Sequence, residues 1–191
     1  MKNLIGNEWV DASDGSTVDV VNPATNEVIA SVPNATKEDV DKAVKIAAEA
    51  QKTWEKISIY ERGRILEKYI DLVEANADSL ASLLSAETGK PIKEAKAEIG
   101  NIRMFVSAYV ERAKHLYGIH IPEGQEPGQE KSIQFTTRAP LGVVACIIPF
   151  NFPSDLFHQK VPSALIMGNA VIVKPSTVNP LTLIKLVDLL R

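Results

Sequence analysis

The chain has 191 residues, and 21 lysines and arginines stand against 24 aspartates and glutamates, which gives a formal net charge of -3. With 45% hydrophobic and 24% charged residues, the composition is typical of a globular domain and excludes collagen-like and disordered proteins. The near balance of charge argues against a protein that binds nucleic acid or a membrane surface, because such proteins carry a basic excess. The single cysteine, Cys146, excludes an intrachain disulfide framework. Because the N-terminus carries no signal-peptide pattern and no apolar run reaches the roughly 20 residues of a membrane span, we expect a cytoplasmic protein.

Short strands and then helices are predicted up to residue 117. Residues 18–21 and 28–32 are rich in β-branched side chains and predict a hairpin across the turn at 22–26. The pairs Thr36/Asp39 and Ser58/Glu61 each predict a helix start by the capping-box spacing, and Gly89 suits a left-handed cap at the end of the third helix. The apolar residues expected on the inner faces include Val40, Ala43, Val44 and Ala47 in the first helix, Ile65, Leu66, Tyr69, Ile70 and Val73 in the second, and Ala95, Ile99, Ile102, Val106 and Tyr109 in a single helix after Pro91.

The stretch 122–130 contains no apolar side chain other than proline. After it, Ile133 and Phe135 alternate with polar residues, a period that predicts a half-buried strand. The stretch is either a linker between domains or a projecting arm. Because a compact pattern resumes immediately afterwards, we favour an arm.

The last fifty residues predict a doubly wound α/β arrangement. The apolar run 142–149 is typical of a strand covered on both faces, and residues 157–167 predict a helix that ends at Gly168. Residues 170–173 predict a second buried strand, and Pro180 begins another helix. The two strands should be parallel. Because two parallel strands do not make a stable sheet alone, we expect a truncated chain, or further strands supplied from elsewhere.

Few residues carry chemistry on spacing alone. His115 and His120 are expected at the surface, no metal site is predicted, and Cys146 reads as an inert core thiol. The carboxyl ends of the two predicted parallel strands, where ligands bind in open α/β sheets, carry Asn151 and Lys174. These could supply amide donors and a cation to a ligand. Alternatively, Asn151 only stabilises a turn, and Lys174 only keeps the end of the strand exposed to solvent.

Several segments, taken in order, resemble the aldehyde dehydrogenase superfamily, and the resemblance covers the whole chain. They are Asn22-Pro23-Ala24-Thr25 with Val28-Ile29, Glu61-Arg62, Glu87-Thr88-Gly89-Lys90-Pro91, Pro140-Leu141-Gly142-Val143-Val144, Ile148-Pro149-Phe150-Asn151-Phe152-Pro153, Pro162-Ser163-Ala164-Leu165, Gly168-Asn169 and Val173-Lys174-Pro175-Ser176. The fold class that this implies is α/β, the N-terminal part of an aldehyde-dehydrogenase-like fold with an incomplete Rossmann-type parallel sheet. Residues 1–121 would be the N-terminal part of the cofactor-binding domain, 122–140 a β arm used in oligomerisation, and 141–191 the start of the nucleotide-binding core.

The resemblance also implies an activity, the NAD(P)-dependent oxidation of an aldehyde to a carboxylic acid. In the family a cysteine thiolate attacks the aldehyde, hydride passes to NAD or NADP, and a water activated by a glutamate hydrolyses the thioester. Asn151 matches the asparagine of the oxyanion hole, and Lys160 a lysine linked to proton relay. Lys174 matches the lysine that contacts the adenosine ribose. The other matched positions are Ile148, Pro149, Phe150, Pro175, Ser176 and Thr177 for the cofactor, and Phe152 and Leu156 for the substrate.

The resemblance has two departures. The catalytic cysteine and the general-base glutamate have no match, since Cys146 does not lie in the motif of that cysteine, and the glycine-containing segments that complete the cofactor site are also absent. The chain alone is therefore expected to be inactive. Where the family commonly has a glutamate that binds the ribose, this chain has Thr177, so NADP is expected to be accepted beside NAD; alternatively, Thr177 only caps the following helix. The full-length protein would be a homo-oligomer. The alternative function is that of a non-catalytic fragment that acts as an interaction module.

Overall fold

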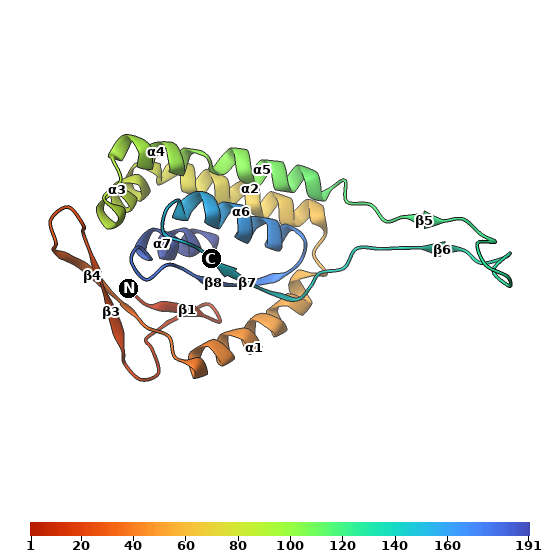
Figure 1. Ribbon diagram of the computed structural model, residues 1–191, viewed down its shortest axis with the longest axis horizontal. Helices are drawn as coiled ribbons and strands as arrows, with labels where there is room; N and C mark the ends of the chain where they lie inside the picture. The colour runs from red at the N-terminus through yellow and green to blue at the C-terminus, as the bar shows by residue number, and fades with distance from the viewer.

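The computed structural model describes all residues, 1–191. A layer of helices covers one side of a small parallel sheet, a single helix lies on the other side, and a long hairpin projects away from both (Figure 1). Both ends of the chain lie near the sheet. None of the helices has the length and apolar character needed to cross a membrane.

The N-terminal strands form two antiparallel hairpins. β1 (Asn3–Ile5) pairs with β2 (Glu8–Val10), and β3 (Thr17–Val21) pairs with β4 (Val28–Pro33). The second hairpin confirms the prediction for residues 18–32. Its inner face packs Val20 and Val32 against Leu181 of the last helix.

Five helices follow, and the three caps that the sequence predicts are present. The helices are α1 (Lys37–Trp54), α2 (Ile59–Ala75), α3 (Ala77–Thr88), α4 (Ile92–Gly100) and α5 (Ile102–Ala113). Thr36 and Asp39 form a complete capping box, Ser58 accepts a hydrogen bond from the N–H of Glu61, and Gly89 ends α3 with φ of +71°.

Two helical predictions were wrong. Val40 and Val44 are 44% and 41% exposed, because α1 turns the face with Asp39 and Gln51 inward instead. Ile65 is also 40% exposed, at the edge of its stripe. The single helix expected after Pro91 is two, because the chain leaves the α4 geometry at Asn101, whose N–H returns to the carbonyl of Glu98 in a tighter turn.

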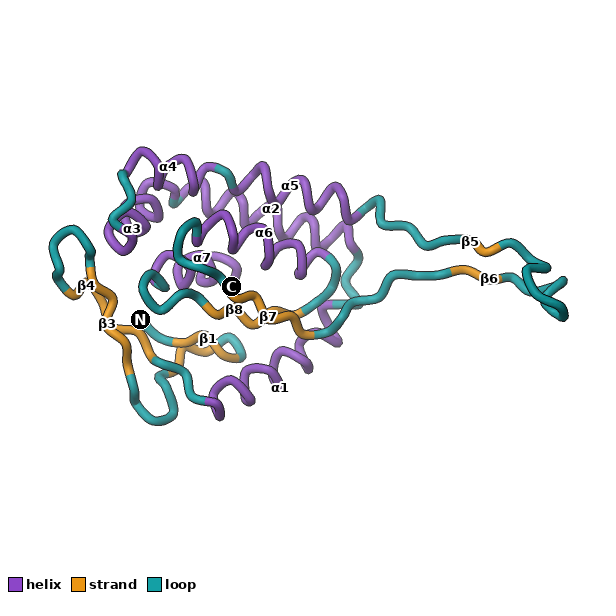
Figure 2. Tube along the Cα trace, viewed as in Figure 1, coloured by secondary structure: helices purple, strands orange, loops and turns teal.

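The projecting hairpin contains β5 (His120–Ile121) and β6 (Gln134–Phe135), which are antiparallel (Figures 1 and 2). The expectation of a half-buried strand here was wrong, since Ile133 is 84% and Phe135 68% exposed. No other part of the chain covers the hairpin. The alternation of apolar residues is therefore real in sequence, but its apolar side faces outward.

The parallel sheet consists of β7 (Val143–Ile147) and β8 (Ala170–Lys174) in the predicted orientation. They alternate with α6 (Pro153–Ile166) and α7 (Leu181–Leu190). Cys146 and Ile148 are buried in the main core, whereas Ile147 is 62% exposed and Ala145 is also exposed. The expectation that both faces of the first strand are covered was therefore wrong, because α1 packs mainly against β8 and leaves one face of β7 open.

The C-terminal end of α6 is anchored by side chains from the helices beneath it. Trp54 Nε1 donates to the carbonyl of Leu165 at 2.8 Å, and Gln51 Nε2 donates to that of Gly168 at 3.0 Å. Between them, Arg62, only 5% exposed, donates from Nε to the carbonyl of Ile166 at 2.9 Å. Carbonyls at the end of a helix have no partner within the helix, so these three donors fix the C-terminal end of α6 and the turn that follows it.

Candidate functional site

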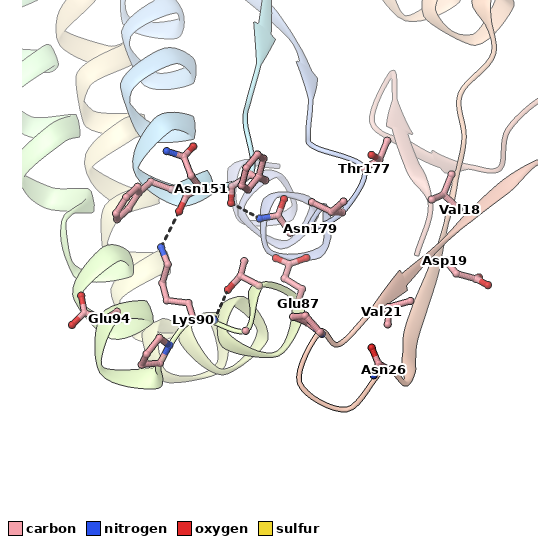
Figure 3. Close-up of a pocket in the computed structure, with 17 residues that line it drawn as sticks. Val18, Asp19, Val21, Asn26, Glu87, Lys90, Glu94, Asn151, Thr177 and Asn179 are labelled. Carbon is pink, nitrogen blue, oxygen red and sulfur yellow. Dashed lines mark hydrogen bonds between the residues drawn. The ribbon is translucent and has the colours of Figure 1, made fainter.

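The loops after β7 and β8 meet at the carboxyl edge of the sheet, as predicted for a ligand site. Together with the β3–β4 hairpin and the turn between α3 and α4, they line an open pocket of about 910 Å³. Figure 3 shows Asn151 at one end of it, Val18, Asp19 and Val21 at the other, and Asn179 and Thr177 between them. The pocket is therefore assembled from four segments that are far apart in the sequence.

The loop after β7 is held by its backbone and leaves the side-chain amide of Asn151 free. Asn179 Nδ2 donates to the carbonyl of Phe150 at 2.8 Å, and Lys90 Nζ donates to the carbonyl of Asn151 at 3.1 Å. The side-chain amide of Asn151 is exposed, has no hydrogen-bond partner, and lies on the side of the loop away from Lys90 (Figure 3). A rigid backbone that carries a free amide is suited to donate to a ligand oxygen.

The loop after β8 presents polar groups beside a helix start that is already satisfied. The carboxylate of Glu87 accepts the N–H groups of Leu181 and Thr182 at 2.7 and 2.9 Å. Burial raises the pKa of Glu87, and the hydrogen bonds from these donors oppose that rise. Because Glu87 provides the cap of α7, the alternative that Thr177 caps this helix is wrong. Thr177 is exposed and lines the pocket.

The pocket brings together four of the residues predicted for the site. These are Phe150, Asn151, Phe152 and Thr177. The other predicted residues do not line it; they are Ile148, Pro149, Leu156, Lys160, Lys174, Pro175 and Ser176.

Three of these outlying residues have defined environments. The side chain of Ile148 lies in the core, 1% exposed, so only its backbone can face a ligand. Lys160 is exposed, and its Nζ donates to the carbonyl of Ile147 at 3.1 Å, behind the strand end. Lys174 is exposed at the end of β8 and donates to the carbonyl of Pro175 at 3.0 Å.

Cys146 is buried and His115 and His120 lie at the surface, as the sequence predicts. Cys146 is 1% exposed, and burial raises the pKa of its thiol, which makes it a poor nucleophile. His115 and His120 are exposed. No group of three or more histidine, cysteine, aspartate or glutamate side chains is arranged to hold a metal ion.

Sequence reasoning missed four residues that position the site, Glu87, Lys90, Glu98 and Asn179. The first two lie in a segment quoted only for its resemblance to the family. Glu98 carried a signal of its own, since it falls beside Ala95 and Ile99 on the buried stripe of α4 and is 2% exposed. A carboxylate on an apolar stripe needs a partner, and its partners here are Lys90 and the start of α6.

Comparisons with known proteins identify the family of the chain. The family model described as "Aldehyde dehydrogenase family" matches residues 9–191. Glutarate-semialdehyde dehydrogenase of Pseudomonas putida is 37% identical over 97% of this chain and 38% of its own length. Succinate semialdehyde dehydrogenase of Acinetobacter baylyi is 38% identical over 98% of this chain and 38% of its own length.

Solved structures show the same fold. Succinate-semialdehyde dehydrogenase from Burkholderia pseudomallei superposes with a TM-score of 0.93 at 33% identity, over 99% of this chain and 38% of that one. A 3,6-anhydro-L-galactose dehydrogenase in complex with NAP superposes with a TM-score of 0.93 at 32% identity, over 99% of this chain and 39% of that one. The chain thus spans little more than a third of these relatives, their N-terminal part. With the family match over nearly its whole length, this chain belongs to the aldehyde dehydrogenase family.

Proposed function

We propose that this chain is the N-terminal portion of an NAD(P)-dependent aldehyde dehydrogenase, in which Asn151 donates a hydrogen bond to the aldehyde oxygen. The observation that carries the proposal is the free, exposed amide of Asn151 on a loop whose flanking carbonyls are held by Asn179 and Lys90. When a nucleophile adds to the aldehyde carbon, negative charge develops on that oxygen. A donor that is already in place stabilises this charge by about 3 kcal/mol.

The polar groups after β8 fit a nicotinamide dinucleotide. The Lys174 ammonium and the hydroxyls of Ser176 and Thr177 follow a parallel strand directly, where ribose and phosphate groups are bound in open α/β sheets. Such a cofactor, when bound, accepts the hydride of the aldehyde. Phe150 and Phe152, 63% and 50% exposed, would cover apolar parts of the cofactor and the substrate, with Leu156 behind them. Lys160 would serve proton transfer from behind the loop.

The activity is tested in a chimaera that joins residues 1–191 to the remaining sequence of the Pseudomonas putida relative. Because relatives of this chain are named for succinate and glutarate semialdehydes, these are the first substrates to assay. Asn151→Ala should lower kcat about 10²- to 10³-fold, while Asn34→Ala, at an exposed position that does not line the pocket, serves as a matched control. Unchanged kcat in Asn151→Ala would refute the role of the amide.

The 191-residue chain by itself should not oxidise aldehydes, because its only thiol, Cys146, is buried. Reduction of NAD or NADP by the isolated chain that disappears in Cys146→Ser would overturn this proposal. In that case the chain would carry its own nucleophile.

We also propose that NADP is used at least as well as NAD. Thr177 is neutral and exposed, and Glu87 already caps α7, so Thr177 is free to face the 2′ position of the ribose. A carboxylate there would repel a 2′-phosphate, whereas a hydroxyl can donate a hydrogen bond to the phosphate and Lys174 can offset its charge. In the chimaera, Thr177→Glu should shift the ratio of kcat/KM toward NAD at least tenfold, and Thr177→Gln should not. A strong NAD preference that the glutamate leaves unchanged would refute the idea.

The hairpin is proposed as the arm that joins copies of the full-length protein in a reducing cytoplasm. Tyr117, Ile119, Ile133 and Phe135 are each at least 65% exposed along it. At the base of the hairpin the two chain segments approach so closely that only glycine fits at position 118, since a Cβ there would lie 1.7 Å from the carbonyl oxygen of Thr136. Replacement of Ile133 and Phe135 by aspartate should shift sedimentation of the chimaera to a smaller species. An inactive chimaera that still associates through the arm would favour the alternative function, an interaction module.

A further inference from the structure

A buried ion pair lies directly beneath the loop that carries Asn151. The side chain of Glu98 is 1% exposed and that of Lys90 14% exposed, and Lys90 Nζ pairs with Glu98 Oε2. Lys90 belongs to the turn between α3 and α4, and Glu98 to α4. Since isolated buried charges are costly, each of the two groups requires the other at this place.

Glu98 also caps the helix that follows the loop. Its Oε1 accepts the N–H of Ser154 at 2.8 Å and that of Asp155 at 3.4 Å. The residue in the N-cap position of α6, Phe152, makes no side-chain cap of its own. A carboxylate at the N-terminus of a helix also complements the helix dipole. Glu98 therefore holds the start of α6, three residues after Asn151.

Lys90 holds the loop itself. Its Nζ donates to the carbonyl of Asn151 at 3.1 Å and lies 4.0 Å from the centroid of the Phe152 ring. The first contact orients the peptide plane that leaves Asn151, and the second is a cation–π contact that orients the next side chain. The close-up shows this ammonium rising from the α3–α4 turn toward the loop (Figure 3).

We propose that Lys90 and Glu98 together are positioning residues for Asn151. The contacts of the pair converge on one backbone segment, 151–155, and fix the chain from the carbonyl of Asn151 to the first turn of α6, while the side chain of Asn151 is left free. The proposal rests on the proposed function, since it matters for catalysis only if the Asn151 amide meets the aldehyde oxygen. The pair touches no reacting atom, and its effect passes through the orientation of Asn151.

The sharpest variant is the double replacement Lys90→Met with Glu98→Gln. The glutamine keeps an oxygen that can accept the N–H of Ser154, and the pair is removed without leaving a buried charge alone. In the active chimaera we expect kcat to fall at least tenfold with KM changed less than twofold. Lys90→Arg should retain most activity. The matched control is Lys96→Met. Lys96 lies in α4, as Glu98 does, and this replacement removes an exposed ion pair with Asp78 of α3.

A double-mutant cycle separates positioning from general destabilisation. If the pair acts through Asn151, the double replacement should cause no further loss of kcat in an Asn151→Ala background. If it only stabilises the fold, the two losses should multiply. Multiplicative losses would overturn the proposal, whereas a fully active Asn151→Ala enzyme would refute the proposed function instead.

A measurement without catalysis tests the same step in the 191-residue chain. Order parameters from ¹⁵N relaxation at the backbone amides of Asn151 and Phe152 should fall from about 0.85 to below about 0.6 in the double replacement. The Lys96→Met control should leave them unchanged. Equal order in wild type and double replacement would overturn the positioning role, whatever the chimaera does.

Discussion

Lowering the pH should destabilise the folded chain through His158, which is completely buried. Its Nε2 shares a 2.9 Å hydrogen bond with the hydroxyl of Tyr69, and its Nδ1 lies 3.4 Å from Ser154 Oγ. The ring of Phe157 packs edge-on against it. Burial penalises the imidazolium form and lowers the pKa of His158 to about 3.

The direction of the change in stability with pH follows from the difference in proton binding between the folded and unfolded states. In the unfolded chain, a histidine binds a proton below about pH 6.5, whereas in the folded chain His158 stays neutral until about pH 3. The unfolded state therefore binds more protons between these values, and stability that is fully present above about pH 6.5 is lost as the pH falls. At about 1.4 kcal/mol for each pKa unit, the loss is about 2 kcal/mol at pH 5 and approaches about 5 kcal/mol in stronger acid.

Urea unfolding at pH 7.5, 6 and 5 measures this loss in wild type and in His158→Gln. The variant is less stable at every pH because its packing changes, but its loss between pH 7.5 and 5 should be smaller than that of wild type by about 2 kcal/mol. The comparison cancels the titration of carboxyl groups that both proteins share, such as Asp155, whose pKa burial raises. Parallel pH profiles for the two proteins would refute the reasoning.

Two further predictions concern stability at neutral pH, both measured by urea unfolding. Arg62→Met should lower the free energy of unfolding by about 3 kcal/mol, because the buried carbonyl of Ile166 loses its donor; a loss below about 1 kcal/mol would contradict this. Gly89→Ala should cost more than Gly15→Ala. Both glycines have positive φ, about +70°, but a Cβ at Gly89 would lie 2.9 Å from Pro23 Cγ, whereas one at Gly15 meets nothing within 4 Å. Equal losses would show that the backbone conformation alone is responsible.

Features that depend on neighbouring residues could be predicted from the sequence alone. The capping box of Thr36 and Asp39, the cap at Ser58 and the left-handed end of α3 at Gly89 all require groups within four residues of one another. Such signals act before any tertiary contact forms. The alternation of strands and helices after residue 141, and with it the parallel sheet, could be predicted for the same reason. The ordered motifs were also enough to indicate the family.

The tertiary structure alone decided which faces are covered and which residues support the site. Val44 and Phe135 have the spacing of core residues but are exposed, since burial depends on whether another element lies against them. Glu87 caps a helix that begins about ninety residues later, and Lys90 reaches Asn151 across 61 positions. No local pattern encodes such distances, because these contacts exist only after the α3–α4 turn packs beside the two loops of the sheet.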